Sequence, residues 1–221
     1  MTAEELINHM IPAIRPSDTA ATALSWMEEY RCSQLPVVDQ EKFKGFITEE
    51  TLREANDRDV PIGELSLTGE QCITGFDAHF FEVLRMASDH KLQMVAVENN
   101  LRLYTGVITV SDGIAFFAQS AAVQMPGSIL VLSMELVSYS LAEIARLVEE
   151  NNAKIISSTI TEDPLDSSRI RLTIKVNQAD LTRIVATLER FDYKIIARYQ
   201  ETRTPELDRD RFDLFMRYLN I

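Results

Sequence analysis

The sequence contains two internal repeats, and these limit the folds that the chain can adopt. The segment Gly106-Val107-Ile108-Thr109 has an earlier copy, Gly45-Phe46-Ile47-Thr48, with the same glycine, apolar pair and threonine. Upstream of these segments the matching positions lie 59 residues apart, and the spacing grows to 61 at the glycine because the second copy has a longer turn. A repeat of this length indicates two copies of one supersecondary unit. The matched positions are Asp18, Ala21, Leu24, Met27, Leu35, Val37 and Val38 in the first copy and Asp77, Phe80, Val83, Met86, Met94, Ala96 and Val97 in the second.

Both copies predict the same order of elements. Apolar residues at helical spacing are followed by two short β-branched runs and then by a second helix. Residues 3–10 are predicted to form a short helix. Further along, the first copy predicts strands at 35–38 and 43–47 and a helix at 49–56. The second predicts a strand at 72–74, a helix at 78–89, strands at 94–97 and 101–108, and a helix at 110–120. Each copy is too small to bury both faces of its sheet, so we expect the two to pack together.

A different repeat follows the turn at Pro126-Gly127. Its positions recur 40 residues apart; the first four alternate as in a half-buried strand, and the next four have the spacing of an amphipathic helix. Two βαβ halves in tandem predict the βαββαβ order of a ferredoxin-like domain. The first half has Leu130, Leu132, Met134, Leu136, Leu141, Ile144, Ala145, Val148, Lys154, Ile155 and Ile156, and the second has Ile170, Leu172, Ile174, Val176, Leu181, Ile184, Val185, Leu188, Lys194, Ile195 and Ile196.

These motifs carry a resemblance to known families. Leu35-Pro36-Val37-Val38-Asp39 followed by Gly45-Phe46-Ile47-Thr48 resembles the CBS domain, and the second copy makes residues 1–120 resemble a tandem CBS pair. A ferredoxin-like unit directly after such a pair resembles the ACT domain. The whole chain to about Gln200 is similar to CBS–ACT proteins of the acetoin-utilisation (AcuB-like) type. The resulting fold class is α/β (α+β), with CBS repeats at 1–60 and 61–122, an ACT-like domain at 127–200 and a C-terminal helix at 201–221.

Thr109 and Asp112 are the first candidates for a binding site. Thr109 stands where a helix N-cap is expected, and Asp112 falls in the first turn. Free N–H groups at a helix start can bind a phosphate, and a carboxylate can accept hydrogen bonds from two neighbouring hydroxyls, so this pair suits a ribose phosphate. A simple capped helix is the alternative interpretation of these residues.

The CBS resemblance implies an adenosine-containing ligand of the AMP, ATP, S-adenosylmethionine or NAD type. It implies that Thr109 and Asp112 hold phosphate and ribose, and that the base lies near Ile14, Arg15 and Leu35. In the first signature Thr51 stands in place of the ribose-binding acid. A neutral hydroxyl cannot offer a charge-assisted bond to a diol, so we expect one ligand per chain rather than two.

Composition and motifs exclude several other functions. A net charge of −12 argues against nucleic acid and anionic membrane surfaces as partners. Cys32 and Cys72 form no CxxC pair and indicate reduced thiols in a cytoplasmic protein; there is no signal peptide and no run of membrane-spanning length. The sequence has no P-loop, GxGxxG or GxSxG motif, and its three histidines lack metal-ligand spacing. We therefore expect no enzyme activity, no metal and no required cofactor.

The ACT resemblance normally implies a small amino acid bound at a glycine in the first strand–helix turn. Here that turn is Val137-Ser138-Tyr139-Ser140, and no glycine follows Gly127. Tyr139 would have to adopt a backbone geometry that suits glycine. We therefore interpret this domain as an assembly element first and as an amino-acid sensor second.

The partners expected from the sequence are a second copy of the chain and an unidentified target protein. The apolar helix segment Ile114-Ala115-Phe116-Phe117 and the tail residues Phe212, Phe215 and Leu219 need cover, and closed two-fold symmetry is the commonest way to supply it. Two functions remain open. One is a nucleotide-sensing regulator, favoured by Asp112; the other is a constitutive dimeric scaffold without nucleotide, favoured by Thr51 and the missing glycine turn.

Overall fold

The structure is a computed structural model that describes residues 2–55 and 57–200. It divides into two compact units between Phe117 and Ala118. The predicted C-terminal helix at 201–221, with Phe212, Phe215 and Leu219, lies outside the described residues. No helix in the described ranges is long and apolar enough to cross a membrane.

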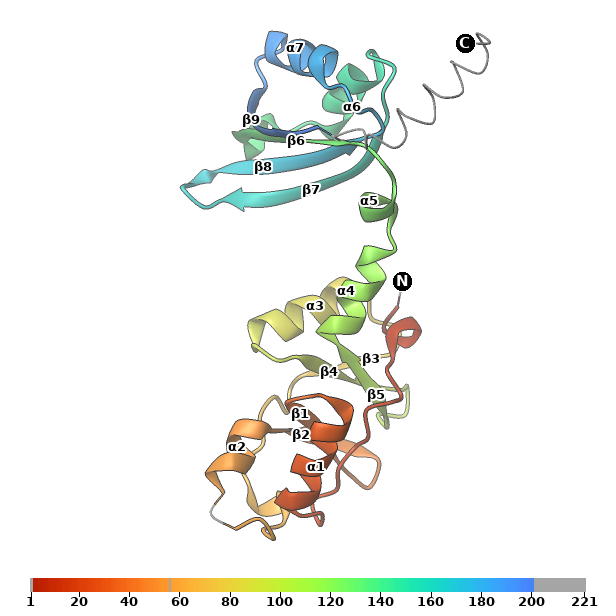
Figure 1. The fold of residues 1–221 in the computed structure, drawn as a ribbon, viewed down its shortest axis with the longest axis vertical. Coiled ribbons are helices and arrows are strands. Elements are labelled where there is room, and N and C mark those ends of the chain that lie inside the picture. Colours follow the sequence, from red (N-terminus) through yellow and green to blue (C-terminus); the bar gives the residue numbers. More distant parts are fainter. Residues whose placement is uncertain (1, 56, 201–221) are drawn as a thin grey trace, which may run out of the picture. The chain divides into compact units, whose positions relative to one another are not determined.

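The first unit holds both copies of the first repeat (Figure 1). The first copy consists of α1 (Ala20–Tyr30), β1 (Gln34–Asp39), β2 (Lys42–Thr48) and α2 (Glu49–Glu54). After a 3-10 turn, η2 (Ile62–Glu64), the second copy adds β3 (Ile73–Gly75), α3 (Phe80–Asp89), β4 (Met94–Glu98), β5 (Tyr104–Thr109) and α4 (Val110–Ala118). The predicted order of elements is therefore confirmed. Most of the predicted element boundaries differ from the observed ones by three residues or fewer.

Two predicted elements differ more. Residues 3–10 form only a 3-10 turn, η1 (Ala3–Leu6), after which Asn8 bridges to β5. The strand predicted to begin at residue 101 begins at Tyr104, because Arg102 has a left-handed backbone with φ of 57° that belongs to a turn. Both differences lie in turns, where hydrogen bonding and not apolar periodicity determines the backbone conformation.

The strands of the two copies form matching sheets. β4 pairs with β3 in parallel and with β5 antiparallel, whereas β1 pairs antiparallel with β2. Ile14 forms a parallel bridge with Val37 and so takes the place that Ile73 of β3 has in the second copy. One buried cluster contains Phe46 of the first copy together with Met94 and Val107 of the second, so the two copies share a core as expected.

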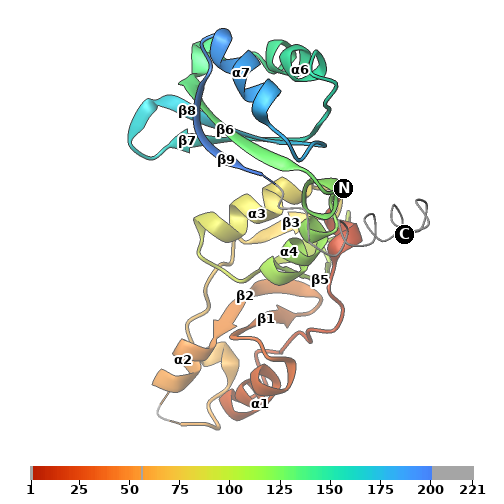
Figure 2. The same ribbon diagram turned by 45° about the horizontal axis from the view of Figure 1, so that its top comes forward.

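The second unit is a four-stranded antiparallel sheet with the strand order β7-β8-β6-β9. Figures 1 and 2 show α6 and α7 side by side on one face of this sheet. Apolar residues on alternating positions of β6 and β8, such as Leu132 and Leu172, pack against Ile144 of α6 and Leu188 of α7. The elements are α5 (Ala121–Gln124), β6 (Ser128–Glu135), η3 (Leu136–Ser138), α6 (Leu141–Glu149), β7 (Ile155–Asp163), β8 (Asp166–Val176), α7 (Thr182–Arg190) and β9 (Lys194–Tyr199).

Two turns of this unit have a clear physical basis. Gly127 has φ of 152°, and a Cβ placed there would lie 2.1 Å from the carbonyl oxygen of Val176, so no other residue fits. In the turn before α6, Tyr139 has φ of −74° and ψ of 119°, which any residue adopts. Tyr139 therefore does not take the glycine-like conformation that an ACT-type turn would have required, and its ring packs against the core of the unit.

Candidate functional site

The second signature lies where β5 ends and α4 begins. Its glycine has a structural purpose, because a Cβ on Gly106 would lie 2.5 Å from Cγ2 of Ile7. The N-terminal segment that contains Ile7 runs along β5, and the backbone N–H of Asn8 donates to the carbonyl oxygen of Val107 at 2.7 Å. The glycine of the first signature makes the same kind of close approach, because a Cβ on Gly45 would lie 3.0 Å from Cβ of Leu67. Each signature glycine therefore admits a crossing segment next to its strand.

Thr109 and Asp112 bind each other at the start of α4. The hydroxyl of Thr109 donates to Oδ2 of Asp112 at 2.6 Å and accepts from the Asp112 backbone N–H at 2.9 Å. The Thr109 N–H also donates to Oδ2, at 3.2 Å. This is reciprocal N-terminal capping, so the alternative interpretation of these residues as a capped helix describes part of what they do. Both side chains are half-buried.

A third donor to the same oxygen comes from Asn8. Its side-chain amide Nδ2 donates to Oδ2 of Asp112 at 3.0 Å, and its Oδ1 accepts from the Met10 N–H at 2.9 Å. Within the described residues, all hydrogen bonds recorded for the carboxylate go to Oδ2, which leaves Oδ1 for another partner. Sequence reasoning missed Asn8, because the contact spans 104 residues and Asn8 belongs to neither signature.

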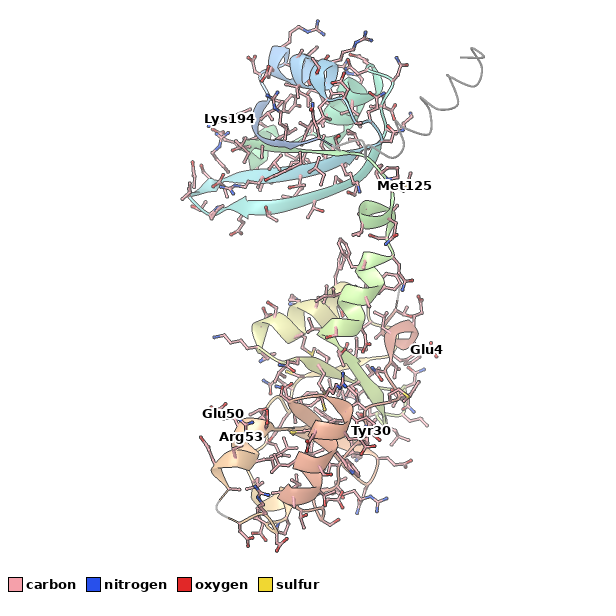
Figure 3. All side chains as sticks on the ribbon, in the orientation of Figure 1. Glu4, Tyr30, Glu50, Arg53, Met125 and Lys194 are labelled. Carbon is pink, nitrogen blue, oxygen red and sulfur yellow. The ribbon has the colours of Figure 1, made fainter. Side chains whose placement is uncertain are left out.

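The first signature has a different chemistry. The hydroxyls of Thr48 and Thr51 lie 3.0 Å apart, and the Thr51 N–H donates to the Thr48 hydroxyl, so Thr48 caps α2 and Thr51 supplies no charge. An adjoining cavity of about 450 Å³ is lined by three acidic residues, Glu49, Glu50 and Glu54. Figure 3 shows Glu50 and Arg53 on α2. Arg53 forms an ion pair with Glu49 at 2.6 Å, which leaves the cavity a net acidic lining that disfavours a phosphate.

The residues expected around the base differ in burial. The side chains of Ile14 and Leu35 are fully buried in the core of the first copy. Arg15 is exposed and lines a cavity of about 670 Å³ together with Tyr104. Because Tyr104 begins β5 and Thr109 ends it, this cavity and the Thr109–Asp112 pair lie at opposite ends of one strand. Arg15 therefore lines a cavity away from Asp112, whereas the expectation that the base lies near Ile14 and Leu35 stays a prediction.

Other polar groups do lie beside the start of α4. The Val110 N–H donates to the carbonyl oxygen of Gln93, and the Gln93 N–H donates to Oε1 of Gln34 at 3.1 Å. The Ser33 hydroxyl donates to Oε1 of Gln93 at 2.8 Å. Gln34 and Gln93 are equivalent positions of the repeat, 59 residues apart, so a polar junction joins the two copies next to the signature. Repeat spacing is the sequence signal that identifies this pair, since neither glutamine belongs to a signature motif.

The two cysteines and Tyr104 of the first unit have raised pKa values. Burial raises the pKa of the Cys32 thiol and of the Cys72 thiol, which disfavours the reactive thiolate. Burial also raises the pKa of the Tyr104 hydroxyl, which has no hydrogen-bond partner in the described parts of the chain. The same parts contain no cluster of His, Cys, Asp and Glu suited to a metal ion.

Comparison with known sequences identifies the first copy. Residues 3–58 match the family model of the CBS domain. A curated relative, inosine-5'-monophosphate dehydrogenase of Methanocaldococcus jannaschii, is 26% identical over 111 residues, which make up 50% of this chain and 22% of the dehydrogenase. The chain thus spans about a fifth of the length of that relative.

Comparison with solved structures identifies the fold. A CBS domain pair/ACT domain protein from Thermotoga maritima is 17% identical, with a TM-score of 0.50 over 54% of this chain and 98% of that one. A protein from Methanocaldococcus jannaschii is 19% identical, with a TM-score of 0.50 over 57% of this chain and 62% of that one. Residues 3–58 therefore match the CBS domain, the first unit has the CBS-pair fold, and a C-terminal antiparallel sheet is added to it. The resemblance of the chain to ACT and acetoin-utilisation proteins stays a prediction.

Proposed function

We propose that the first unit is a regulatory module that binds one adenosine-containing ligand at Thr109 and Asp112. The observation that carries the proposal is the Asp112 carboxylate, which is held at the start of a helix by three donors to Oδ2 while Oδ1 is left for a ligand. A fixed carboxylate loses little further freedom on binding, and two vicinal ribose hydroxyls can donate to it with charge assistance. The start of α4 also presents the positive end of the helix dipole, which attracts a phosphate. The N–H groups of Val110 and Asp112 already donate to Gln93 and Thr109, so the dipole and not these donors is the contribution of this turn.

The direct test is a thermal-shift screen with AMP, ATP, S-adenosylmethionine and NAD, followed by calorimetry with the strongest binder. Asp112→Ala removes charge-assisted bonds and is expected to weaken binding by about 1.5–3 kcal/mol. Thr51→Ala is the matched control in the other signature and is expected to change binding little. Equal losses from the two substitutions would rule out a single site, and no binding of any of the four ligands would refute the proposal.

The hydrogen bonds between Thr109 and Asp112 also fit a second function, that of a scaffold without nucleotide. The Thr109 hydroxyl and Oδ2 of Asp112 satisfy each other without a ligand, which is what a constitutive dimeric scaffold with an empty cleft requires. Such a scaffold would show no thermal shift with any of the four ligands in the screen. The regulator and the scaffold therefore make opposite predictions for one experiment.

For the second unit we propose a ferredoxin-like, ACT-type assembly domain that responds to, or transmits, the signal of the first. The support is its element order β6-α6-β7-β8-α7-β9 and its strand order β7-β8-β6-β9. The turn between β6 and α6 has neither glycine nor a positive φ, which disfavours the backbone contact that would hold an amino acid. Pull-down experiments with the full chain would identify the target protein that receives the signal.

We also propose that the chain is a homodimer with or without ligand. On α3 and α4, the side chains of Phe81, Ile114 and Phe117 are 70%, 64% and 54% exposed. Apolar patches of this kind usually form interfaces. Light scattering on the ligand-free protein is expected to give twice the 25.1 kDa mass of one chain. The double variant Ile114→Glu with Phe117→Glu is expected to give the mass of a single chain. A wild-type mass near 25.1 kDa at micromolar concentration would refute the dimer.

A further inference from the structure

The N-terminal segment, residues 2–9, belongs to the first copy in sequence but docks on the second. The Ala3 N–H donates to the carbonyl oxygen of Ala78 at 2.8 Å and the Glu4 N–H to that of Phe76 at 2.9 Å. The Asn8 N–H donates to Val107 at 2.7 Å. Ala3 is fully buried in the core of the second copy, and Figures 1 and 2 both show the segment beside β5.

Asn8 connects this segment to the Asp112 carboxylate. Its Oδ1 already accepts from the Met10 N–H, so its Nδ2 is the atom that faces Asp112. The same carboxylate oxygen takes the hydroxyl and the N–H of Thr109, and a carboxylate with three donors on one oxygen has a defined orientation. Undocking of the segment removes one of these three donors and leaves the carboxylate held by Thr109 alone, so its orientation is less restricted.

We propose that Asn8 is a positioning residue for the ribose, and that ligand binding at Asp112 thereby holds the N-terminal segment on the second copy. This inference rests on the proposed nucleotide site and goes beyond it by naming the element that responds. A ligand that needs the oriented carboxylate binds the docked state better than the undocked one. Differential affinity of that kind shifts the equilibrium towards the docked state. The segment would then report whether the site is occupied.

The test combines binding and hydrogen exchange on the full chain, with the strongest binder of AMP, ATP, S-adenosylmethionine and NAD. Asn8→Ala keeps the backbone bond to Val107 and removes the amide donor to Asp112 together with the Oδ1 that accepts from the Met10 N–H. Because the carboxylate loses one of its three donors, we expect the dissociation constant to rise about tenfold or more. Asn100→Ala is the control, since Asn100 is exposed and its side chain has no recorded hydrogen bond to the described residues. We expect wild-type binding from it.

Hydrogen exchange measures the docking of the N-terminal segment, which a loss of ligand affinity alone would not change once the site is saturated. At a ligand concentration 100 times the dissociation constant, the amides of Ala3, Glu4 and Asn8 are expected to exchange up to about 100-fold more slowly in the wild type. In Asn8→Ala, at the same multiple of its own dissociation constant, this protection is expected to fall. Wild-type affinity and full protection in Asn8→Ala would overturn the inference and leave the nucleotide site intact. Absence of binding by the wild type would overturn both.

Discussion

The substitution Gly106→Ala tests whether the signature glycine is needed for the N-terminal segment to pack closely on β5. Gly106 has no positive φ, so on backbone grounds alone alanine would stabilise the protein by about 0.4–1 kcal/mol. The new Cβ, however, would lie 2.5 Å from Cγ2 of Ile7, and this methyl group sits on a β-branched carbon that cannot swing away. Overpacking of this kind destabilises by about 1–3 kcal/mol, so the clash outweighs the gain.

The assay is urea unfolding followed by fluorescence. Trp26 is the single tryptophan of the chain and packs against the core of the first copy, so its emission reports the first unit separately from the second. We expect Gly106→Ala to lower the free energy of unfolding of this unit by about 1–2 kcal/mol. The control is Ile7→Ala, which removes the clashing methyl group.

A double-mutant cycle then decides the cause. If the two side chains meet, Gly106→Ala in the Ile7→Ala background is expected to be neutral or stabilising, with a coupling of about 1–3 kcal/mol between the sites. A neutral or stabilising Gly106→Ala in the wild-type background, or additive effects in the cycle, would refute the idea that the glycine is needed for the crossing segment.

Two predictions concern the second unit. The pKa of Asp163 is lowered chiefly by its hydrogen bonds from Arg171, so the stability that the pair adds is present above the ordinary value of 3.8 and is lost as the pH falls through the lowered pKa. Arg171→Ala is expected to return the Asp163 titration, followed by NMR, towards 3.8; an unchanged titration would show that Arg171 is not the cause. Leu172 is fully buried between the sheet and its helices, and Leu172→Ala is expected to lower the unfolding free energy by about 2–5 kcal/mol. A loss below about 1 kcal/mol in calorimetric unfolding of this unit would contradict the assigned core.

Repetition made most of the fold predictable. The 40-residue repeat placed Leu132 and Leu172 on one sheet face and Ile144 and Ile184 on the helices, and all four are buried in one cluster. A pattern that occurs twice constrains both copies, because each must form the same unit. The N-terminal segment also recurs, since η1 (Ala3–Leu6) and η2 (Ile62–Glu64) have the same place in the two copies and Thr68 bridges to Phe46 as Asn8 bridges to Val107. The repeat did not indicate that each of these segments leaves its own copy and docks on the other.

The candidate site was less predictable, for a reason that concerns distance along the chain. Capping links residues three apart, so the Thr109–Asp112 pair follows from local spacing. The position of a base depends on segments that tertiary packing brings near, and neither Ile14 nor Leu35 is exposed to receive one. Asn8 was invisible because a single asparagine at a distance of 104 residues leaves no periodic signal.

The asymmetry between the two signatures leads to the last prediction. Thr51→Asp copies Asp112 into the first signature, where Thr48 stands ready to cap it, and the new charge at the start of α2 should stabilise that helix by about 0.3–1 kcal/mol. The acid alone should not create a second site, because Glu50 and Glu54 would still repel a phosphate from the adjoining cavity. Among the described residues, no side chain equivalent to Asn8 is recorded there either, since the crossing segment meets β2 through Thr68, whose hydroxyl donates to the Phe46 carbonyl instead. Calorimetry on Thr51→Asp is therefore expected to give one ligand per chain with wild-type affinity. A stoichiometry of two would show that the missing acid was the only defect of the first signature, and that neither the acidic lining nor the absent amide matters.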